Sequence, residues 1–368
     1  MKVPFFAIVL FISSVLYANA SFAPSSECKS CHPNIYKEFE SSMHQNATVY
    51  KDPIHAAVWN KHPINKKKQK YVCAKCHTPA ANNLSDMLGK GTKGMPDPEN
   101  ATHNEAVSCA YCHRIESIKP MSKSNTNIIS KKDKHYFGTL KDAVKSSFHT
   151  TSSENANFNN GNVCVGCHSH KQNKAKLNVC STNLANEMDG ANCVSCHMPK
   201  VAGSVSTERE TKKHAFHGFP GTHSNQDMLA KYVDLELLKN INSFDVSVNN
   251  KSSHALLLHP LRVAQLRVTI ERDGTKEKLK TEVFVRVIGK DGKPTPPWIA
   301  NAVVKDTMIK NNEKRVITYN KQLLRGDKVY MTLGYFLVKP KAAKKFGLDK
   351  DPVASKFYVL KSSTVTVK

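Results

Sequence analysis

The apolar positions of the chain fall into three stretches with different patterns. Lys2 precedes an apolar run from Val3 to Leu16, and the small-residue site Ala18-Asn19-Ala20 follows it. A basic start, a short apolar run and an A-x-A end predict a secretory signal peptide over residues 1–20. A membrane anchor is the alternative, but the run is shorter than the roughly 20 residues that a spanning helix needs. We therefore expect an exported, periplasmic protein that is soluble after cleavage.

The second stretch, residues 21–215, shows helical spacing only over short segments. Between Pro33 and Thr48, apolar residues recur at the three- and four-residue spacing of one helix face. Similar spacing predicts helices over Ala106–Ile115 and Leu140–Phe148. We expect a domain of short helices and loops.

The third stretch alternates between apolar and polar residues, as half-buried strands do. Turn-forming pairs such as Asp273-Gly274 and Asp291-Gly292 separate the alternating segments. The predicted strands are Phe244–Val248, Val263–Ile270, Val283–Ile288, Val316–Tyr319, Val329–Val338 and Phe357–Val367. The pattern predicts a two-domain α + β protein, with a β-sandwich of roughly immunoglobulin type over residues 224–368 after a domain over residues 21–223.

Cysteine spacing identifies the chemistry of the first domain. Ten of the eleven cysteines lie in five C-x-x-C-H motifs. Two cysteines at this spacing attach one haem through thioether bonds, and the adjacent histidine binds its iron. The motifs are Cys28-Cys31-His32, Cys73-Cys76-His77, Cys109-Cys112-His113, Cys164-Cys167-His168 and Cys193-Cys196-His197.

Two other uses of C-x-x-C pairs are less consistent with the sequence. Zinc sites need such pairs two at a time, whereas here there are five, each followed by a histidine. A thioredoxin-like redox site would require a βαβ context that the pattern does not show. We therefore expect five covalently bound haem c groups and five iron-binding histidines.

Net charge fits this cofactor content. The chain carries 54 Lys and Arg against 30 Asp and Glu, a net charge of +24. Such an excess usually suggests nucleic acid or an anionic membrane as a partner, but no nucleic-acid motif is present. Five haems would bring about ten negative propionates, which offset part of the excess.

Several segments resemble one family of multihaem cytochromes c. They are the five motifs, the segment Ser42-Met43-His44-Gln45-Asn46-Ala47, and Cys196-His197-Met198-Pro199. The family includes the tetrahaem electron acceptor of hydroxylamine oxidoreductase, and the resemblance covers Glu27 to His223. Asn249 to Pro260 looks like a loop of a C-terminal module that some relatives carry. The fifth motif and the extra domain depart from the tetrahaem pattern, so electron transfer is implied more firmly than any partner.

The sixth iron position decides whether a haem transfers electrons or binds substrate. The resemblance implies that His44, His103 and His149 are such distal ligands. His217 at the domain junction and His254 on a β-domain loop are two further candidates, with His55 and His62 as reserves. The remaining histidines are interpreted as surface residues or propionate partners, namely His135, His170, His214, His223 and His259. Cys180, the odd cysteine, is interpreted as a buried thiol, with an iron ligand or reactive group as the alternative.

Three functions remain open from the sequence. The first is periplasmic electron transfer in a respiratory chain, with redox-protein donors and acceptors that present acidic docking surfaces to lysine-rich segments such as Lys131–Lys134. The second is a multihaem reductase with one open-coordinate haem that reduces a small nitrogen or sulfur compound. The third is a subunit whose β-domain associates peripherally with a membrane redox complex. Nucleic acid is not expected as a partner, and no catalytic residue is assigned.

Overall fold

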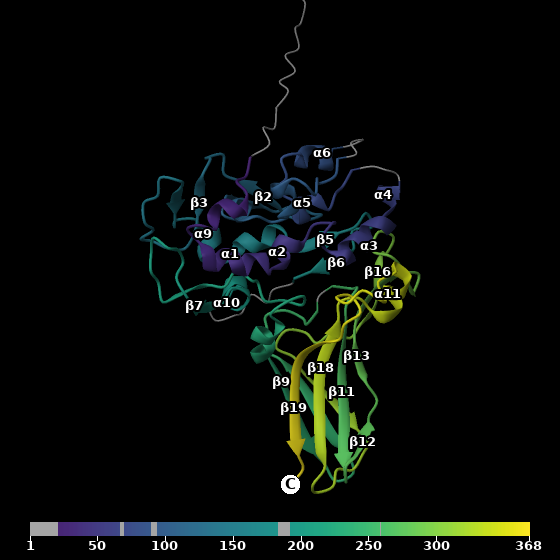
Figure 1. The fold of residues 1–368 in the computed structure, drawn as a ribbon. Helices are drawn as coiled ribbons and strands as arrows, with labels where there is room; N and C mark the ends of the chain where they lie inside the picture. Colours follow the sequence, from purple (N-terminus) through teal and green to yellow (C-terminus); the bar gives the residue numbers. More distant parts are fainter. Residues whose placement is uncertain (1–20, 67–69, 90–93, 183–191, 258) are drawn as a thin grey trace, which may run out of the picture.

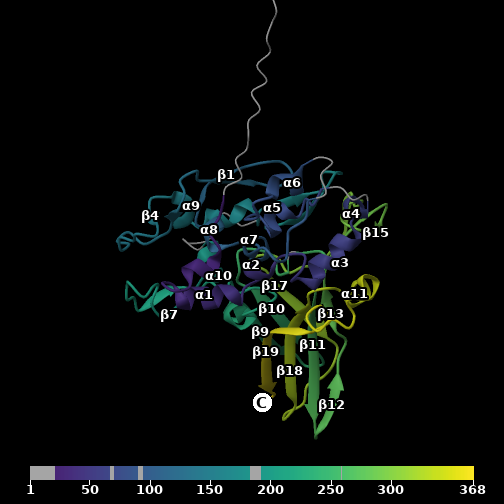
Figure 2. The ribbon, with the colours of Figure 1, turned by 45° about the horizontal axis from the view of Figure 1, so that its top comes forward.

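The chain has a helix-rich N-terminal part and a mostly β C-terminal part. The computed structural model describes residues 21–66, 70–89, 94–182, 192–257 and 259–368, so the predicted signal peptide lies outside the described residues. Figure 1 shows a broad N-terminal part from which an elongated part made of long strands projects. The turned view in Figure 2 shows the same division. The predicted order of helices and strands is therefore confirmed at this coarse level.

The helices of the N-terminal part are short and begin at well-defined capping residues. α1 starts with Pro33 directly after His32, and α3 starts with Pro53, where the Asp52 carboxylate accepts the Ile54 N–H at 2.9 Å. The helical segments are η1 (Ser25–Cys28), α1 (Pro33–Glu40), α2 (Met43–Asn46), α3 (Pro53–Lys61), α4 (Pro63–Lys66), α5 (Ala74–His77), α6 (Leu84–Leu88), α7 (Ala101–Asn104), α8 (Cys109–Cys112), α9 (Ala156–Asn159), η2 (Asn162–Gly166) and α10 (Cys193–His197).

Small two-stranded sheets connect these helices. Three of the pairs are antiparallel, and β3 pairs with β4 in parallel. The strands are β1 (Ile115–Lys119), β2 (Thr126–Ile129), β3 (His135–Phe137), β4 (Thr150–Ser152), β5 (His170–Gln172), β6 (Asn178–Ser181), β7 (Lys200–Ala202) and β8 (Lys213–Ala215). Each helix of this part thus has only a few turns, and each sheet has only a few paired residues.

The predicted helix over Leu140–Phe148 is wrong. This segment is a loop between β3 and β4, and it leaves Phe148 74% exposed and Val144 50% exposed. Its apolar residues have no surface to pack against, so helical spacing gains nothing from burial. The expected helix over Pro33–Thr48 is divided into α1 and α2, because the Ser42 side chain caps a new helix by accepting the Gln45 N–H.

Two antiparallel sheets share one core in the C-terminal part. One sheet has the order β17-β10-β9, and the other has the order β12-β11-β18-β19 with β13 also on β11. Apolar residues of both sheets, including Phe244, Val246, Leu266 and Leu333, are fully buried together. The bounds are η3 (Gln226–Tyr232), β9 (Val233–Lys239), β10 (Phe244–Asn250), β11 (Val263–Arg272), β12 (Thr275–Lys278), β13 (Glu282–Phe284), β17 (Lys314–Tyr319), β18 (Lys328–Phe336) and β19 (Tyr358–Thr366).

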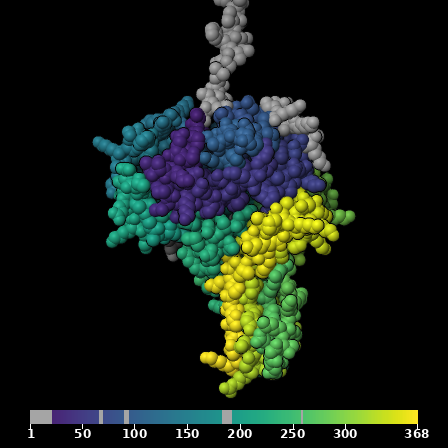
Figure 3. Space-filling model, viewed as in Figure 1, coloured from purple at the N-terminus to yellow at the C-terminus, as the bar shows by residue number. Residues whose placement is uncertain are grey.

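The remaining C-terminal elements join the two parts of the chain. A small sheet has the order β15-β14-β16, made of β14 (Arg286–Lys290), β15 (Lys293–Pro294) and β16 (Ala302–Asp306). Its Ile288 packs with Val179 of β6. Helix α11 (Pro340–Phe346) and the loop after it pack on Ile54 and Ala57 of α3, so the C-terminal segment lies against the N-terminal part, as Figure 3 shows. Among the described residues, no helix combines the length and apolar character that a bilayer span requires.

Candidate functional site

Each C-x-x-C-H motif lies on a short helical turn or at its edge. Examples are α8 and α10, which contain the third and fifth cysteine pairs. On a helix, residues three apart lie on the same face, so both thiols of a motif point to one side. None of the eleven cysteines, all of which are described, forms a disulfide. The thiols are thus arranged for attachment to a common group.

The histidines of four motifs are oriented by the backbone. Nδ1 of His32, His77, His113 and His197 lies 2.6–3.1 Å from a carbonyl oxygen, which belongs to Val205, Ala47, Phe137 and Pro220, respectively. Because a carbonyl can only accept, Nδ1 must donate its proton there. Nε2 therefore keeps a free lone pair, which is the state that a metal-binding imidazole needs.

Four motif histidines face a second histidine from a distant part of the chain. The ring centres are 6.4 Å apart for His32 and His149, 6.4 Å for His113 and His217, 6.2 Å for His197 and His254, and 5.9 Å for His168 and His44. The His197–His254 rings are nearly parallel, with an interplanar angle of 14°. Four of the five predicted distal histidines are therefore brought opposite a motif histidine, although their role as ligands stays a prediction.

This spacing fits an iron atom between the rings. An imidazole–metal bond is about 2 Å, and the ring centre lies about 1 Å further from the metal, so two imidazoles on one metal would have centres about 6 Å apart. The surroundings also fit a bulky group. Although His168 lies close to the histidines of two other motifs, His77 and His197, the residue is exposed and so borders free space. In the described part of the chain, no three His, Cys, Asp or Glu side chains converge to hold a metal ion directly. The residues present therefore fit haem better than a bare metal ion.

Burial keeps these imidazoles neutral. Burial first, and then the neighbouring rings of His168, His217 and His197, lower the pKa of His44 to about 3. Burial and the nearby His113 ring likewise lower the pKa of His217 to about 3. A neutral ring offers a lone pair to a metal without first losing a proton.

The second motif lacks such a facing pair. His77 lies 4.2 Å from His55 by ring centres, which is too close for a metal between them. Nδ1 of both rings donates to the same Ala47 carbonyl, and Nε2 of His55 is bonded to the Tyr71 hydroxyl at 3.1 Å. No histidine of the described residues faces His77 at the spacing of the other four pairs. The nearby His259 is half-buried, and its predicted role as a surface residue or a propionate partner stays a prediction.

His103 is engaged in hydrogen bonds that fix the local loop. Its Nδ1 accepts the Asp97 N–H at 3.0 Å, and its Nε2 lies 2.7 Å from the Asn82 side-chain oxygen. With both nitrogens bonded in this way, the ring has no lone pair available for a metal. The structure gives no geometric support to the predicted ligand role of His103.

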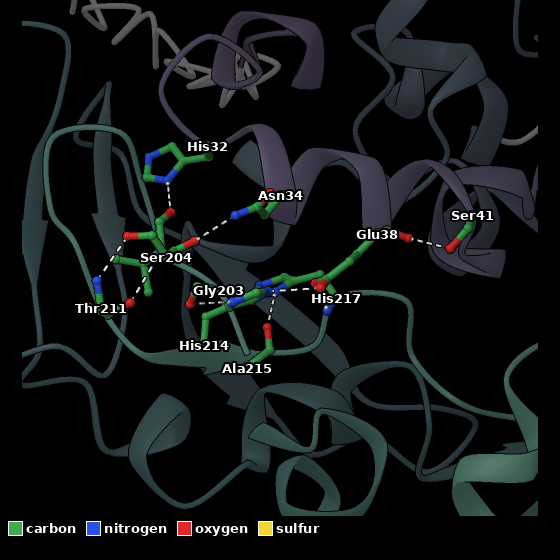
Figure 4. Close-up of polar contacts among 11 residues, drawn as sticks. His32, Asn34, Glu38, Ser41, Gly203, Ser204, Thr211, His214, Ala215 and His217 are labelled. Carbon is green, nitrogen blue, oxygen red and sulfur yellow. Dashed lines mark hydrogen bonds and ion pairs between the residues drawn. The ribbon is translucent and has the colours of Figure 1, made fainter. Parts of the chain in front are cut away.

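A buried carboxylate positions the segment that contains His217. Figure 4 shows Glu38 of α1 pointing toward His214 and His217. One of its oxygens lies 2.8 Å from Nε2 of His214, and the other accepts the His217 N–H at 2.9 Å. His214 is 2% exposed, so its predicted surface location is wrong. The role of Glu38 could not be predicted from the sequence, because Glu38 lies 179 residues before His217.

Contacts between motifs define a spatial order that differs from the sequence order. The thiols of Cys28 and Cys109 are adjacent, so the first motif lies beside the third. His44 is close to both His217 and His197, which places the fourth motif between the third and the fifth. Cys76 lies within hydrogen-bonding reach of Cys167, so the second motif branches from the fourth. The five sites therefore form one connected group.

Comparisons with known proteins give a family model that matches part of the chain and a solved structure with a similar fold. Residues 27–114 match the family model of cytochrome c554 and c-prime. The penta-haem cytochrome c552 from Thermochromatium tepidum has a similar fold, with a TM-score of 0.75 and 20% identity over 95% of this chain and 99% of that one. A superoxide reductase (neelaredoxin) from Archaeoglobus fulgidus covers 37% of this chain and 88% of its own at 9% identity, but its TM-score of 0.21 carries no argument. The curated proteins contain no match.

Proposed function

We propose that this chain, a multihaem c-type cytochrome with covalently bound haem c, transfers electrons between redox proteins of a periplasmic respiratory chain. The observation that carries this proposal is the set of four facing histidine pairs, each at a spacing of about 6 Å. An iron held on both sides has no site for a substrate, but it can still gain or lose an electron. Five motifs in one connected group suit passage of electrons from one end of the group to the other.

The chain's own residues would set the properties of such a path. Bound haem supplies the redox-active iron, and histidine on both sides leaves it at a lower potential than histidine with methionine. Backbone carbonyls at Nδ1 of the motif histidines hold the rings in place and raise their basicity. Partial burial of His44 and His113 would limit the access of water to the iron-binding positions.

The location and the partner proposals rest on the sequence and the surface. The pattern of residues 1–20 supports export to the periplasm. The exposed basic segment Lys131–Lys134 leads directly into β3, whose Phe137 carbonyl holds His113. A cationic segment next to the third motif would attract an acidic redox partner. The two C-terminal sheets with their common core support a sandwich of immunoglobulin type over residues 224–368.

The second motif supports a second candidate function. Because no described histidine faces His77, its haem is the one that could keep an open sixth position. An open iron next to buried cationic residues could bind and reduce a small nitrogen or sulfur compound. His259 would close that position if its ring turned toward the iron.

Electron paramagnetic resonance of the ferric holoprotein, with its haem content measured, tests both functions. Electron transfer predicts five haems per chain, of which at least four are low-spin. A high-spin signal worth one haem that changes on adding nitrite would favour the reductase. If all five haems are low-spin, His259 is the candidate sixth ligand of the haem at His77. His259→Ala should then convert that haem to high-spin. High-spin signals from two or more haems in the unmodified protein would refute the proposed pairs.

A further inference from the structure

A group of cationic side chains lies in the seam between the two parts of the chain. Arg262 precedes β11, Arg286 begins β14, and Lys339 precedes α11. Arg262, Lys339 and His223 all act on His259, and together with burial they lower its pKa to about 3. These residues come from four separate segments, so the fold has assembled the group from distant parts of the sequence.

Arg262 has no counter-ion among the described residues. Arg262 is half-buried, and among the described residues no side chain accepts a hydrogen bond from its guanidinium or lies within ion-pair distance of it. Asp52 is close enough to favour its charge, but that carboxylate instead accepts the Ile54 N–H. A charge that has lost part of its hydration and has no partner is unfavourable. An anion bound beside Arg262 would compensate this cost.

The neighbouring cations are also incompletely paired. Arg286 Nε is buried without a hydrogen bond, and the carboxylate of Asp306 lies at 4.0 Å from it. Nζ of Lys339 donates to the backbone carbonyl of Arg286 at 2.9 Å, which is not a charged partner. The group as a whole therefore has more positive charge than its surroundings neutralise.

We propose that Arg262, with Arg286 and Lys339, forms a half-buried binding site for a carboxylate or a similar oxyanion. The planar guanidinium matches two oxygens of such a group, which a lysine cannot do. Two sources have this chemistry: a haem propionate and a free oxyanion. Arg262 acts electrostatically on His168 and, through His259, lies near His77, so the site is next to the second and fourth motifs.

This inference rests on the proposed haem sites but not on the direction or purpose of electron transfer. The variant Arg262→Gln removes the charge, and Arg325→Gln, on an exposed residue of the same part, is the matched control. The readouts on the full-length holoprotein are haem content, the midpoint potential of each haem, and the unfolding temperature with and without added nitrite or phosphate at constant ionic strength. Full haem content with unchanged spin states would show that the haem sites themselves are intact.

The two sources give different results. If a propionate is bound, Arg262→Gln should lower the potential of one haem, because a nearby cation disfavours the more positive ferric state. We expect about a tenfold change in its reduction equilibrium, which is about 59 mV for one electron, with no effect of added anions on the unmodified protein. If a free oxyanion is bound, nitrite or phosphate should raise the unfolding temperature of the unmodified protein but not of Arg262→Gln.

The proposal would be overturned if the midpoint potentials of Arg262→Gln equal those of Arg325→Gln and if added anions leave the unfolding temperature of the unmodified protein unchanged. If Arg262→Gln yields no holoprotein, Arg262→Lys decides, because it keeps the charge and loses the planar fork. For Arg262→Lys we expect at least a threefold change in the reduction equilibrium of one haem or in the affinity for the anion. The proposal would also be overturned if Arg262→Lys equals the unmodified protein in both measurements.

Discussion

Replacing His254 with alanine tests whether the C-terminal part completes a redox site of the N-terminal part. The His254 ring lies 6.2 Å from that of His197 and nearly parallel to it. Its Nδ1 donates to the Ala255 carbonyl at 3.0 Å, which leaves Nε2 available. Cys193 and Cys196 are unchanged in the variant, so we expect five haems per chain with the fifth haem lacking its sixth ligand.

The size of the effect follows from the number of sites and the rigidity of the loop. One haem of five should change from low-spin to high-spin, which is about one-fifth of the total iron signal. Another histidine cannot easily replace the lost ligand, because the fully buried Asn250 holds the loop through bonds to the carbonyls of His254 and Lys310 at 2.9 and 2.7 Å. The alanine variant should leave a gap of imidazole size.

Paramagnetic resonance with haem quantification measures this change, and free imidazole provides a second test. Imidazole should fill the gap in His254→Ala and restore the low-spin signal. The control is His135→Ala, because the His135 ring bonds to the Thr150 hydroxyl and faces no motif histidine. As many low-spin haems in His254→Ala as in the unmodified protein, at full haem content, would refute the reasoning from ring spacing.

Two further predictions concern the residues that hold the fold around these sites. Glu38→Ala should lower the free energy of unfolding by about 1–3 kcal/mol, because it leaves the buried His214 ring and the His217 N–H without their partner. Thermal unfolding measures this, and an unchanged midpoint would contradict it. Asp327→Asn should cost about 2 kcal/mol, because the carboxylate accepts two bonds from Arg272 at 2.7 and 2.8 Å. The bond from Arg272 lowers the pKa of Asp327 in the folded state, so this stabilisation should be present above about pH 4, the usual pKa of an unfolded Asp, and lost as the pH falls below it. Denaturant unfolding between pH 2 and 7 would show it, and an equal pH dependence in Asp327→Asn would argue against the assignment.

Features that depend on local sequence could be predicted, whereas features that depend on distant contacts could not. A C-x-x-C-H motif carries its chemistry within five residues, and strand alternation reflects burial on one sheet face. The strands β10, β11, β17, β18 and β19 therefore lie where alternation predicts them. The loop over Leu140–Phe148 has helical spacing but no surface to pack on, and spacing alone does not reveal this.

Facing histidines were the hardest to predict because they are partners across long separations. The separation is 117 residues between His32 and His149, and local sequence contains no sign of which ring faces which. His103 illustrates the difficulty, because it lies six residues before a motif yet bonds to Asp97 and Asn82. The buried position of His214 was equally hard to predict, because polar residues are usually expected on the surface unless a buried partner is known.

The arrangement of the two parts argues that the β part has a role in the redox sites and is more than a docking module. It places His254 opposite His197 and Arg262 within the electrostatic reach of His168. Direct bonds cross the same seam, since the Asn173 amide donates to the carbonyls of Pro297 and Ala300 at 2.7 and 2.6 Å. A module that serves only for docking would lie away from the cofactor sites, and its movement would leave those sites unchanged. Here a displacement of the strands by a few ångströms would separate the His197 and His254 rings, so the proposed ligand role of His254 predicts that movement of the β part changes the properties of the fifth haem.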